Sequence, residues 1–113
     1  MKILVVDDNE LVALLVQEVL EGQNHMTKTA GDGESGYSLY LDFEPDVVIS
    51  DIHMPKKNGL QLIKAILKHN PRTKVVLMTG SNGRYETAAL HRVRILRKPF
   101  SWIELLGILN NLE

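Results

Sequence analysis

The sequence predicts an α/β fold: a doubly wound sheet of five parallel strands, with helices on both faces. Short apolar runs rich in β-branched residues alternate five times with segments whose apolar residues recur at helical spacing. This alternation is typical of parallel sheets joined by right-handed crossovers. In addition, polar residues follow four of the apolar runs, where the carboxyl ends of parallel strands form ligand sites.

The five expected strands share a short apolar run that is bounded by turn-forming residues. The first is the run K-I-L-V-V, and the second is the poorest of the five because it alternates only weakly. Their expected bounds are Lys2–Val6, His25–Ala30, Asp46–Ser50, Lys74–Met78 and Val93–Leu96.

Five helices are expected between and after these strands, the fourth of them short. Asn9 can cap the first, which Gly22 ends, and Ser101 with Glu104 forms a capping box for the last, which runs to about Leu112. The three helices between them are expected at Glu34–Phe43, Leu60–His69 and Arg84–His91.

Length and composition indicate one globular domain over residues 1–113. The absence of cysteine excludes disulfides and thiolate catalysis, and the net charge of -1 gives no general attraction to nucleic acid or membrane. The first apolar run is too short for a signal peptide or a membrane span, so we expect a cytoplasmic protein.

Polar side chains at the expected strand ends predict one shared site. Asp7 and Asp8 follow the first run, Asp51 the third, Thr79 the fourth, and Lys98 the fifth. Taken singly, a strand-end Asp can simply cap the next helix, and a lone Lys is more often just solvated. Three carboxylates in one cleft repel one another, and Mg²⁺ relieves that repulsion while retaining water ligands.

The same group of residues suits phosphoryl transfer, which depends mainly on positioning and charge stabilisation. Asp51 is the expected nucleophile and would become an aspartyl phosphate. Lys98 supplies an ammonium group and Thr79 a hydroxyl donor, while Gly80 leaves space for the phosphoryl group and offers a backbone N–H.

In these residues the chain resembles the receiver domains of response regulators over essentially its whole length. The resemblance implies a flavodoxin-like fold with strand order 2-1-3-4-5. The matching motifs are the acid pair Asp7-Asp8, Asp51 within D-x-x-M-P-x-x-x-G, Thr79 with Gly80, and Lys98-Pro99-Phe100.

The resemblance also implies roles for the site residues and for partners. A histidine kinase or phosphotransfer protein would phosphorylate Asp51, and the domain would act on an unknown downstream protein or a fused output domain. Its catalysis would extend only to its own phosphorylation and dephosphorylation. Mg²⁺ would be held by Asp8, Asp51 and the backbone carbonyl of His53, with assistance from Asp7. Thr79 and Lys98 would bind phosphoryl oxygens, and the side chains of His53 and Ser81 would tune dephosphorylation.

Three features depart from the family pattern. Ile95 occupies the position that usually carries Tyr or Phe, whose ring moves when the threonine is drawn toward the phosphate. Lys98 follows Thr79 by 19 residues, a shorter interval than is usual, and His91-Arg92-Val93 replaces the common Gly-Ala pair. We therefore predict an altered switch, transmitted by Thr79 and loop order instead of ring rotation.

Three other functions compete with a phosphoacceptor. A haloacid-dehalogenase-like phosphatase needs a second Asp two residues after the nucleophile, where this chain has His53. A flavin or nucleotide binder lacks support because no Gly-rich phosphate loop is present. A phosphorylation-independent interaction domain on the same fold stays open because of Ile95.

Overall fold

The computed structural model describes residues 1–54, 56–80 and 93–112. All five strands are parallel and lie in the order β2-β1-β3-β4-β5, which confirms the expected sheet. The strands are β1 Lys2–Val6, β2 Met26–Ala30, β3 Val47–Asp51, β4 Lys74–Thr79 and β5 Arg94–Arg97.

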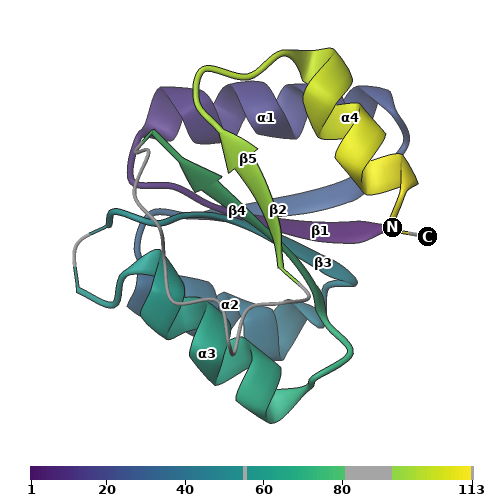
Figure 1. Ribbon diagram of the computed structural model, residues 1–113. Helices are drawn as coiled ribbons and strands as arrows, with labels where there is room; N and C mark the ends of the chain where they lie inside the picture. The colour runs from purple at the N-terminus through teal and green to yellow at the C-terminus, as the bar shows by residue number, and fades with distance from the viewer. Residues whose placement is uncertain (55, 81–92, 113) are drawn as a thin grey trace.

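Within the described ranges, four helices cover the two faces of the sheet (Figure 1). Helices α1 and α4 lie on one face, and α2 and α3 lie on the other. Their bounds are α1 Glu10–Gly22, α2 Gly33–Phe43, α3 Gly59–His69 and α4 Trp102–Asn110. The short helix expected over Arg84–His91 falls outside the described residues, so the expected total of five helices is not tested.

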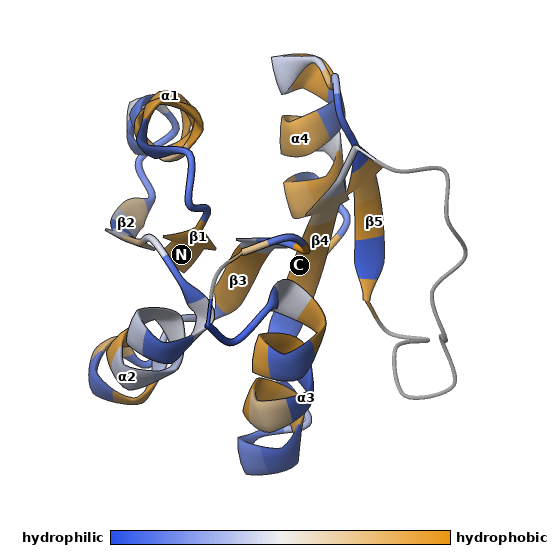
Figure 2. Cartoon of the chain, turned by 90° about the vertical axis from the view of Figure 1, so that its left-hand side faces the viewer, coloured by the Kyte–Doolittle hydropathy of each residue, from blue (hydrophilic) through white to orange (hydrophobic). Residues whose placement is uncertain are grey.

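Successive side chains along each strand point to opposite faces of the sheet, so the core has two layers. In β1, Ile3 and Val5 pack beneath α1 and α4, whereas Leu4 and Val6 pack against α2 and α3. Strands buried on both faces read as nearly continuous apolar runs, and Figure 2 shows β1, β3 and β4 largely in the hydrophobic colour. The two apolar layers thus hold the central strands, and with them the site, in fixed register.

Several strand boundaries differ from those expected, and the differences affect the site. Asp51 and Thr79 are the last residues of β3 and β4 because ladder pairing continues through both, to Met78 and Arg97 respectively. His25 is not part of β2, because its N–H donates to Leu20 in the C-terminal turn of α1. The carboxylate and the hydroxyl therefore project from paired strands, which are stiffer than loops.

The expected helix caps at both ends of the chain are present. Asn9 Oδ1 accepts hydrogen bonds from Leu11 and Val12, and Ser101 forms a reciprocal capping box with Glu104. The last helix ends at Asn110, two residues before the expected end. No helix in the described ranges is long and apolar enough to cross a bilayer.

Candidate functional site

The polar residues at the strand ends meet at the carboxyl edge of the sheet, as expected. Val6 pairs with Ser50 and Thr79 with Arg97, so β1, β3, β4 and β5 end at nearly the same level. The Lys98 N–H donates to the Thr79 carbonyl at 2.7 Å, which fastens the residue after β5 to the end of β4. This backbone bond fixes where the lysine side chain begins.

The Lys98 side chain reaches across the edge of the sheet and contacts two of the carboxylates. Its Nζ lies 3.2 Å from Asp7 Oδ2 and 3.7 Å from Asp51 Oδ1. Asp7 is 1% exposed, while Asp51 is 9% exposed and opens to solvent through its carboxylate. The shared ammonium links the end of β1 to the end of β3 and partly compensates two charges that the fold buries.

Asp7 and Asp8 follow one another in sequence but differ in environment. Both oxygens of the buried Asp7 carboxylate have partners, because Oδ1 accepts from the Asn9 N–H at 2.9 Å and Oδ2 faces Lys98. Asp8 is exposed, but one of its oxygens belongs to a cluster with Asp7 and Asp51 in which one ligand atom from each lies within 4.8 Å of the others. Asp8 and Asp51 are thus the more available donors.

Burial raises the pKa of the Asp51 carboxyl above its usual value. The Lys98 ammonium opposes this rise, while the charges of Asp7 and Asp8 add to it, and a hydrogen bond from the Ile52 N–H stabilises the ionised form. Three carboxylates and one ammonium leave an excess of negative charge in the cleft. A hard divalent cation that takes oxygen ligands, as Mg²⁺ does, fits this donor set.

The loop after Asp51 is closed on itself by backbone contacts. The Gly59 N–H donates to the Ile52 carbonyl at 2.8 Å, and a Cβ at position 59 would overlap the Asp51 carbonyl oxygen. Only glycine permits so close a backbone approach. His53 lies in this loop with an exposed side chain, so its ring is not part of the acidic cluster.

Three further residues were predicted for the site: Gly80, Ile95 and Ser81. Gly80 is exposed, and a Cβ there would meet nothing within 4 Å, so the space expected beside Thr79 is present. Ile95 pairs with Leu77, two rungs before the Thr79–Arg97 pair, and is 39% exposed. Ser81 lies outside the described residues.

Sequence reasoning missed several groups that hold the site. Asn58 and Gln61 form a second capping box, at the start of α3, for which the signal N-x-x-Q was visible in the sequence. The Ser50 hydroxyl donates to the Asp51 carbonyl at 2.9 Å, and the Asn9 N–H holds Asp7. The sequence could not predict these last two contacts, because serine is common and every residue except proline has a backbone N–H.

Comparison with known proteins identifies the family of this chain. The family described as the response regulator receiver domain matches residues 3–110. The chain belongs to this family. As a receiver domain it is a phosphoacceptor module of two-component signalling and not a classical enzyme.

Two curated relatives resemble this receiver domain over nearly its whole length. Protein CcdB of Bacillus subtilis is 34% identical over 109 residues, which cover 93% of this chain and 91% of that protein. Transcriptional regulatory protein CpxR of Escherichia coli is 35% identical over 109 residues, which cover 94% of this chain and 46% of that protein. The chain therefore spans less than half of CpxR, and its match to regulatory protein AtoC of Escherichia coli covers 17% of that protein.

Solved receiver structures share the fold closely. The chemotaxis response regulator CheY4 of Vibrio cholerae matches with a TM-score of 0.90 at 27% identity, covering 99% of this chain and 98% of that one. The signal receiver domain of an HD domain-containing protein from Pseudomonas fluorescens also has a TM-score of 0.90, at 30% identity, covering 98% of this chain and 92% of that one.

Proposed function

We propose that this receiver accepts a phosphoryl group on the side chain of Asp51. The observation that carries the proposal is the position of Lys98 Nζ, 3.7 Å from Asp51 Oδ1 and 3.2 Å from Asp7 Oδ2, at the open end of an acidic cluster. The arrangement supplies an ionised acceptor with a fixed cation beside it. Phosphoryl transfer needs little more than such positioning and charge stabilisation.

In the transfer step, one Asp51 carboxylate oxygen forms a bond to the phosphorus of the donor. The bond from phosphorus to the donor breaks, and its electron pair stays on the donor, which for a histidine kinase or phosphotransfer protein is an imidazole nitrogen. Lys98, the Thr79 hydroxyl and the Gly80 N–H bind the transferred oxygens. Water later cleaves the acyl phosphate, and the side chains of His53 and Ser81 tune that rate.

The proposal includes Mg²⁺, which supplies positive charge to the phosphoryl oxygens during transfer. Asp8, Asp51 and the backbone carbonyl of His53 would hold the ion, and Asp7 assists by keeping Lys98 in place. Support comes from the clustered carboxylate oxygens and from the pKa of Asp51, which is raised mainly by burial and further by the neighbouring charges of Asp7 and Asp8 that a cation would offset. These oxygen donors are the ligands that Mg²⁺ prefers.

The kinase or phosphotransfer protein would dock on α1, beside the cleft. Leu11, Leu14 and Leu15 are 63%, 50% and 41% exposed. Three exposed leucines on one helix form an apolar surface of the kind that partner proteins bind. Downstream, residues 1–113 would act as one receiver domain, in the cytoplasm, on a separate protein or a fused output domain. Direct binding of nucleic acid by this chain is not part of the proposal.

Incubation with acetyl phosphate and Mg²⁺, followed by intact-mass measurement, tests this function. We expect one phosphate adduct that requires Mg²⁺, disappears in Asp51→Asn and persists in Asp42→Asn, a control at an exposed acid of α2. An adduct that remains in Asp51→Asn contradicts the assignment of the acceptor. Inertness toward both acetyl phosphate and a cognate kinase would instead favour the phosphorylation-independent interaction domain.

A further inference from the structure

The loop between β3 and α3 carries the His53 carbonyl, so its position sets the geometry of the proposed metal site. Two backbone hydrogen bonds hold its ends, from the Ile52 N–H to Met78 at 3.1 Å and from the Gly59 N–H to Ile52 at 2.8 Å. Because the second bond closes the loop, a displacement of one loop residue is transmitted to the others. A contact on the outer side of the loop would therefore support the loop as a whole.

The N-terminus of α2 provides that support through a backbone contact. Gly33 is buried at the first position of α2, and a Cβ there would overlap the carbonyl oxygen of Lys57 in the loop. No unusual backbone dihedral requires glycine here, since the described glycines have no positive φ. The requirement for glycine at position 33 comes from the close approach alone.

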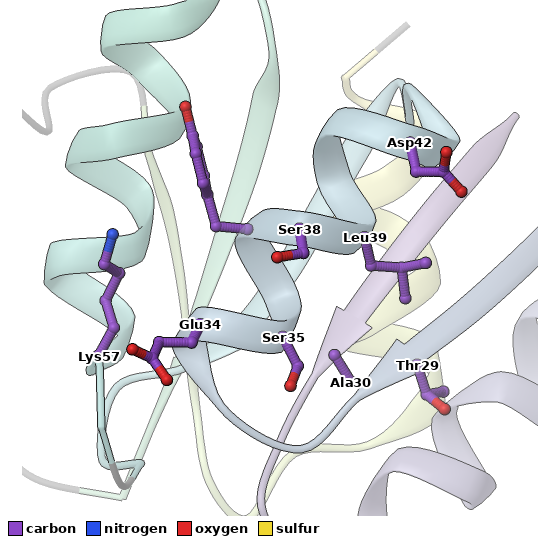
Figure 3. Close-up of a pocket in the computed structure, with 9 residues that line it drawn as sticks. Thr29, Ala30, Glu34, Ser35, Ser38, Leu39, Asp42 and Lys57 are labelled. Atoms are coloured by element: carbon purple, nitrogen blue, oxygen red, sulfur yellow. The ribbon is translucent and has the colours of Figure 1, made fainter.

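Side-chain contacts along the same boundary are weaker. Lys56 Nζ lies 3.9 Å from Glu34 Oε2, but both side chains are largely exposed, and such pairs add little. Lys57 Nζ lies 5.1 Å from the Tyr37 ring centroid. Figure 3 shows Lys57 facing the same side of α2 as Glu34, while Ser35 and Thr29 lie on the other side. Of the contacts between α2 and the loop, the backbone approach at Gly33 is therefore the one that restricts which residue fits.

Helix α2 is anchored by contacts that do not involve the loop. The Asp32 side chain caps it by accepting from the Ser35 N–H at 2.8 Å. A Cβ at Gly36 would meet Val6 at 3.2 Å and Leu62 at 3.3 Å, so α2 sits tightly on the sheet and on α3. An enlarged residue at position 33 would therefore displace the loop more than the helix.

We propose that Gly33 is a positioning residue for the phosphoacceptor site, because it lets α2 brace the loop between Asp51 and Gly59. The inference rests on the proposed function and adds a residue to it that touches neither phosphate nor metal. Gly33→Ala pushes the Lys57 carbonyl outward and carries the His53 carbonyl with it. Changes in groups that orient metal ligands typically weaken metal binding by one to two orders of magnitude.

The test compares three Gly→Ala variants in the full chain. Gly33→Ala meets the loop and Gly31→Ala meets nothing within 4 Å, whereas the atoms nearest to a Cβ at position 36 belong to the side chains of Val6 and Leu62, outside the loop. For each variant, the Mg²⁺ dissociation constant, the unfolding midpoint in urea and the amide shifts of the metal-free protein are measured.

We expect about tenfold weaker Mg²⁺ binding in Gly33→Ala, with amide shifts at residues 51–59 even without metal. Gly31→Ala should match the parent protein, and Gly36→Ala should keep the parent's Mg²⁺ affinity whether its stability rises or falls. The inference is overturned if Gly33→Ala binds Mg²⁺ like the parent, or if the affinities of Gly33→Ala and Gly36→Ala fall in step with their stabilities.

A second pair of variants serves if Gly33→Ala does not fold. Lys57→Gly loosens the loop at the position that α2 contacts. Lys57→Gln removes the same charge but keeps a Cβ and a long side chain, so the backbone freedom of the loop is unchanged. Weaker Mg²⁺ binding in Lys57→Gly than in Lys57→Gln supports the brace, and equal binding overturns it. Failure of the proposed function itself has a different signature, since the parent protein would then form no phosphate adduct at Asp51.

Discussion

The two sides of the carboxyl edge of the sheet are built differently. Over β1 and β3, Asp7 and Asp51 are buried, accept backbone hydrogen bonds and are joined by Lys98. Over β5, an edge strand of four residues carries Ile95 at 39% exposure between exposed arginines. The acidic side holds buried charge with hydrogen bonds and ion pairs, whereas the described residues of β5 present mainly exposed side chains.

This contrast separates the chemistry of the receiver from the transmission of its signal. The proposed acceptor Asp51, the Lys98 ammonium and the Thr79 hydroxyl all project from strand ends or from the residue after one, so we expect their chemistry not to depend on the residue at position 95. An aliphatic, partly exposed Ile95 cannot act as a ring that swings between buried and exposed positions. If the separation holds, substitutions on the acidic side change the chemistry far more than a substitution at Ile95.

Replacement of Lys98 should have the largest effect. Lys98→Ala removes the ammonium beside Asp51, and loss of one preorganised electrostatic group typically lowers a rate by about a hundredfold or more. It also leaves buried Asp7 without its cation, which we expect to cost about 2 kcal/mol of unfolding free energy. Phosphorylation kinetics and urea unfolding measure both effects, with exposed Lys64→Ala as control. Equal rates in the two variants would contradict the role of Lys98.

Mg²⁺ should stabilise the folded protein through the acidic cluster. At ten times its dissociation constant, a ligand that binds only the folded state adds about 1.4 kcal/mol. Thermal or urea unfolding with and without Mg²⁺ measures this gain. We expect the gain to disappear in Asp8→Asn and to persist in Asp42→Asn. A gain of equal size in both variants would place the ion elsewhere.

Asp51→Asn should make the metal-free protein more stable than its parent at neutral pH, because the amide removes a charge that the fold buries. The folded pKa of Asp51 is raised by burial, so the unfolded chain releases this proton at lower pH than the folded one. Stability therefore falls as pH rises from the ordinary carboxyl pKa through the raised value. The variant should lack that fall, as urea unfolding across this pH range can measure; a variant less stable than its parent at neutral pH would contradict this account.

Substitution at Ile95 should have the smallest effect on chemistry. Ile95→Tyr changes a partly exposed side chain, so we expect stability to change by less than about 0.5 kcal/mol and the phosphorylation rate to stay unchanged. A fall in rate comparable to that of Lys98→Ala would show that the two sides are not separable. The signal itself can be followed by amide NMR with a beryllofluoride phosphate analogue, where shifts at residues 80–97 are expected. Their absence would refute the altered switch.

The sequence was sufficient for the features that depend on local patterns. The continuous apolar runs of β1, β3 and β4 identified the central strands, and the polar residues at their ends predicted which side chains lie together at the carboxyl edge. Boundaries were less accurate, because pairing with neighbouring strands, and not local propensity, extends β4 to Thr79. The expected short helix over Arg84–His91 and the role of Ser81 remain predictions.

Contacts between distant segments could not be deduced from any single segment. Lys98 and Asp7 are expected to lie near each other because both follow strands that end at the same edge of the sheet. That one ammonium contacts both Asp7 and Asp51 depends on how far the lysine side chain extends, which the sequence does not show. The contact of Gly33 with Lys57 is harder still, because a glycine at the start of a helix has several ordinary explanations. Only the packing of α2 against the loop reveals it.

Chemical identification of the phosphorylated residue tests the central claim most directly. After reaction with acetyl phosphate and Mg²⁺, borohydride reduction converts an aspartyl phosphate to homoserine, which peptide mass spectrometry locates. We predict homoserine at position 51 and nowhere else, with its yield strongly reduced in Lys98→Ala. Homoserine at position 7 or 8, or a yield independent of Lys98, would contradict the assignment of acceptor and cation.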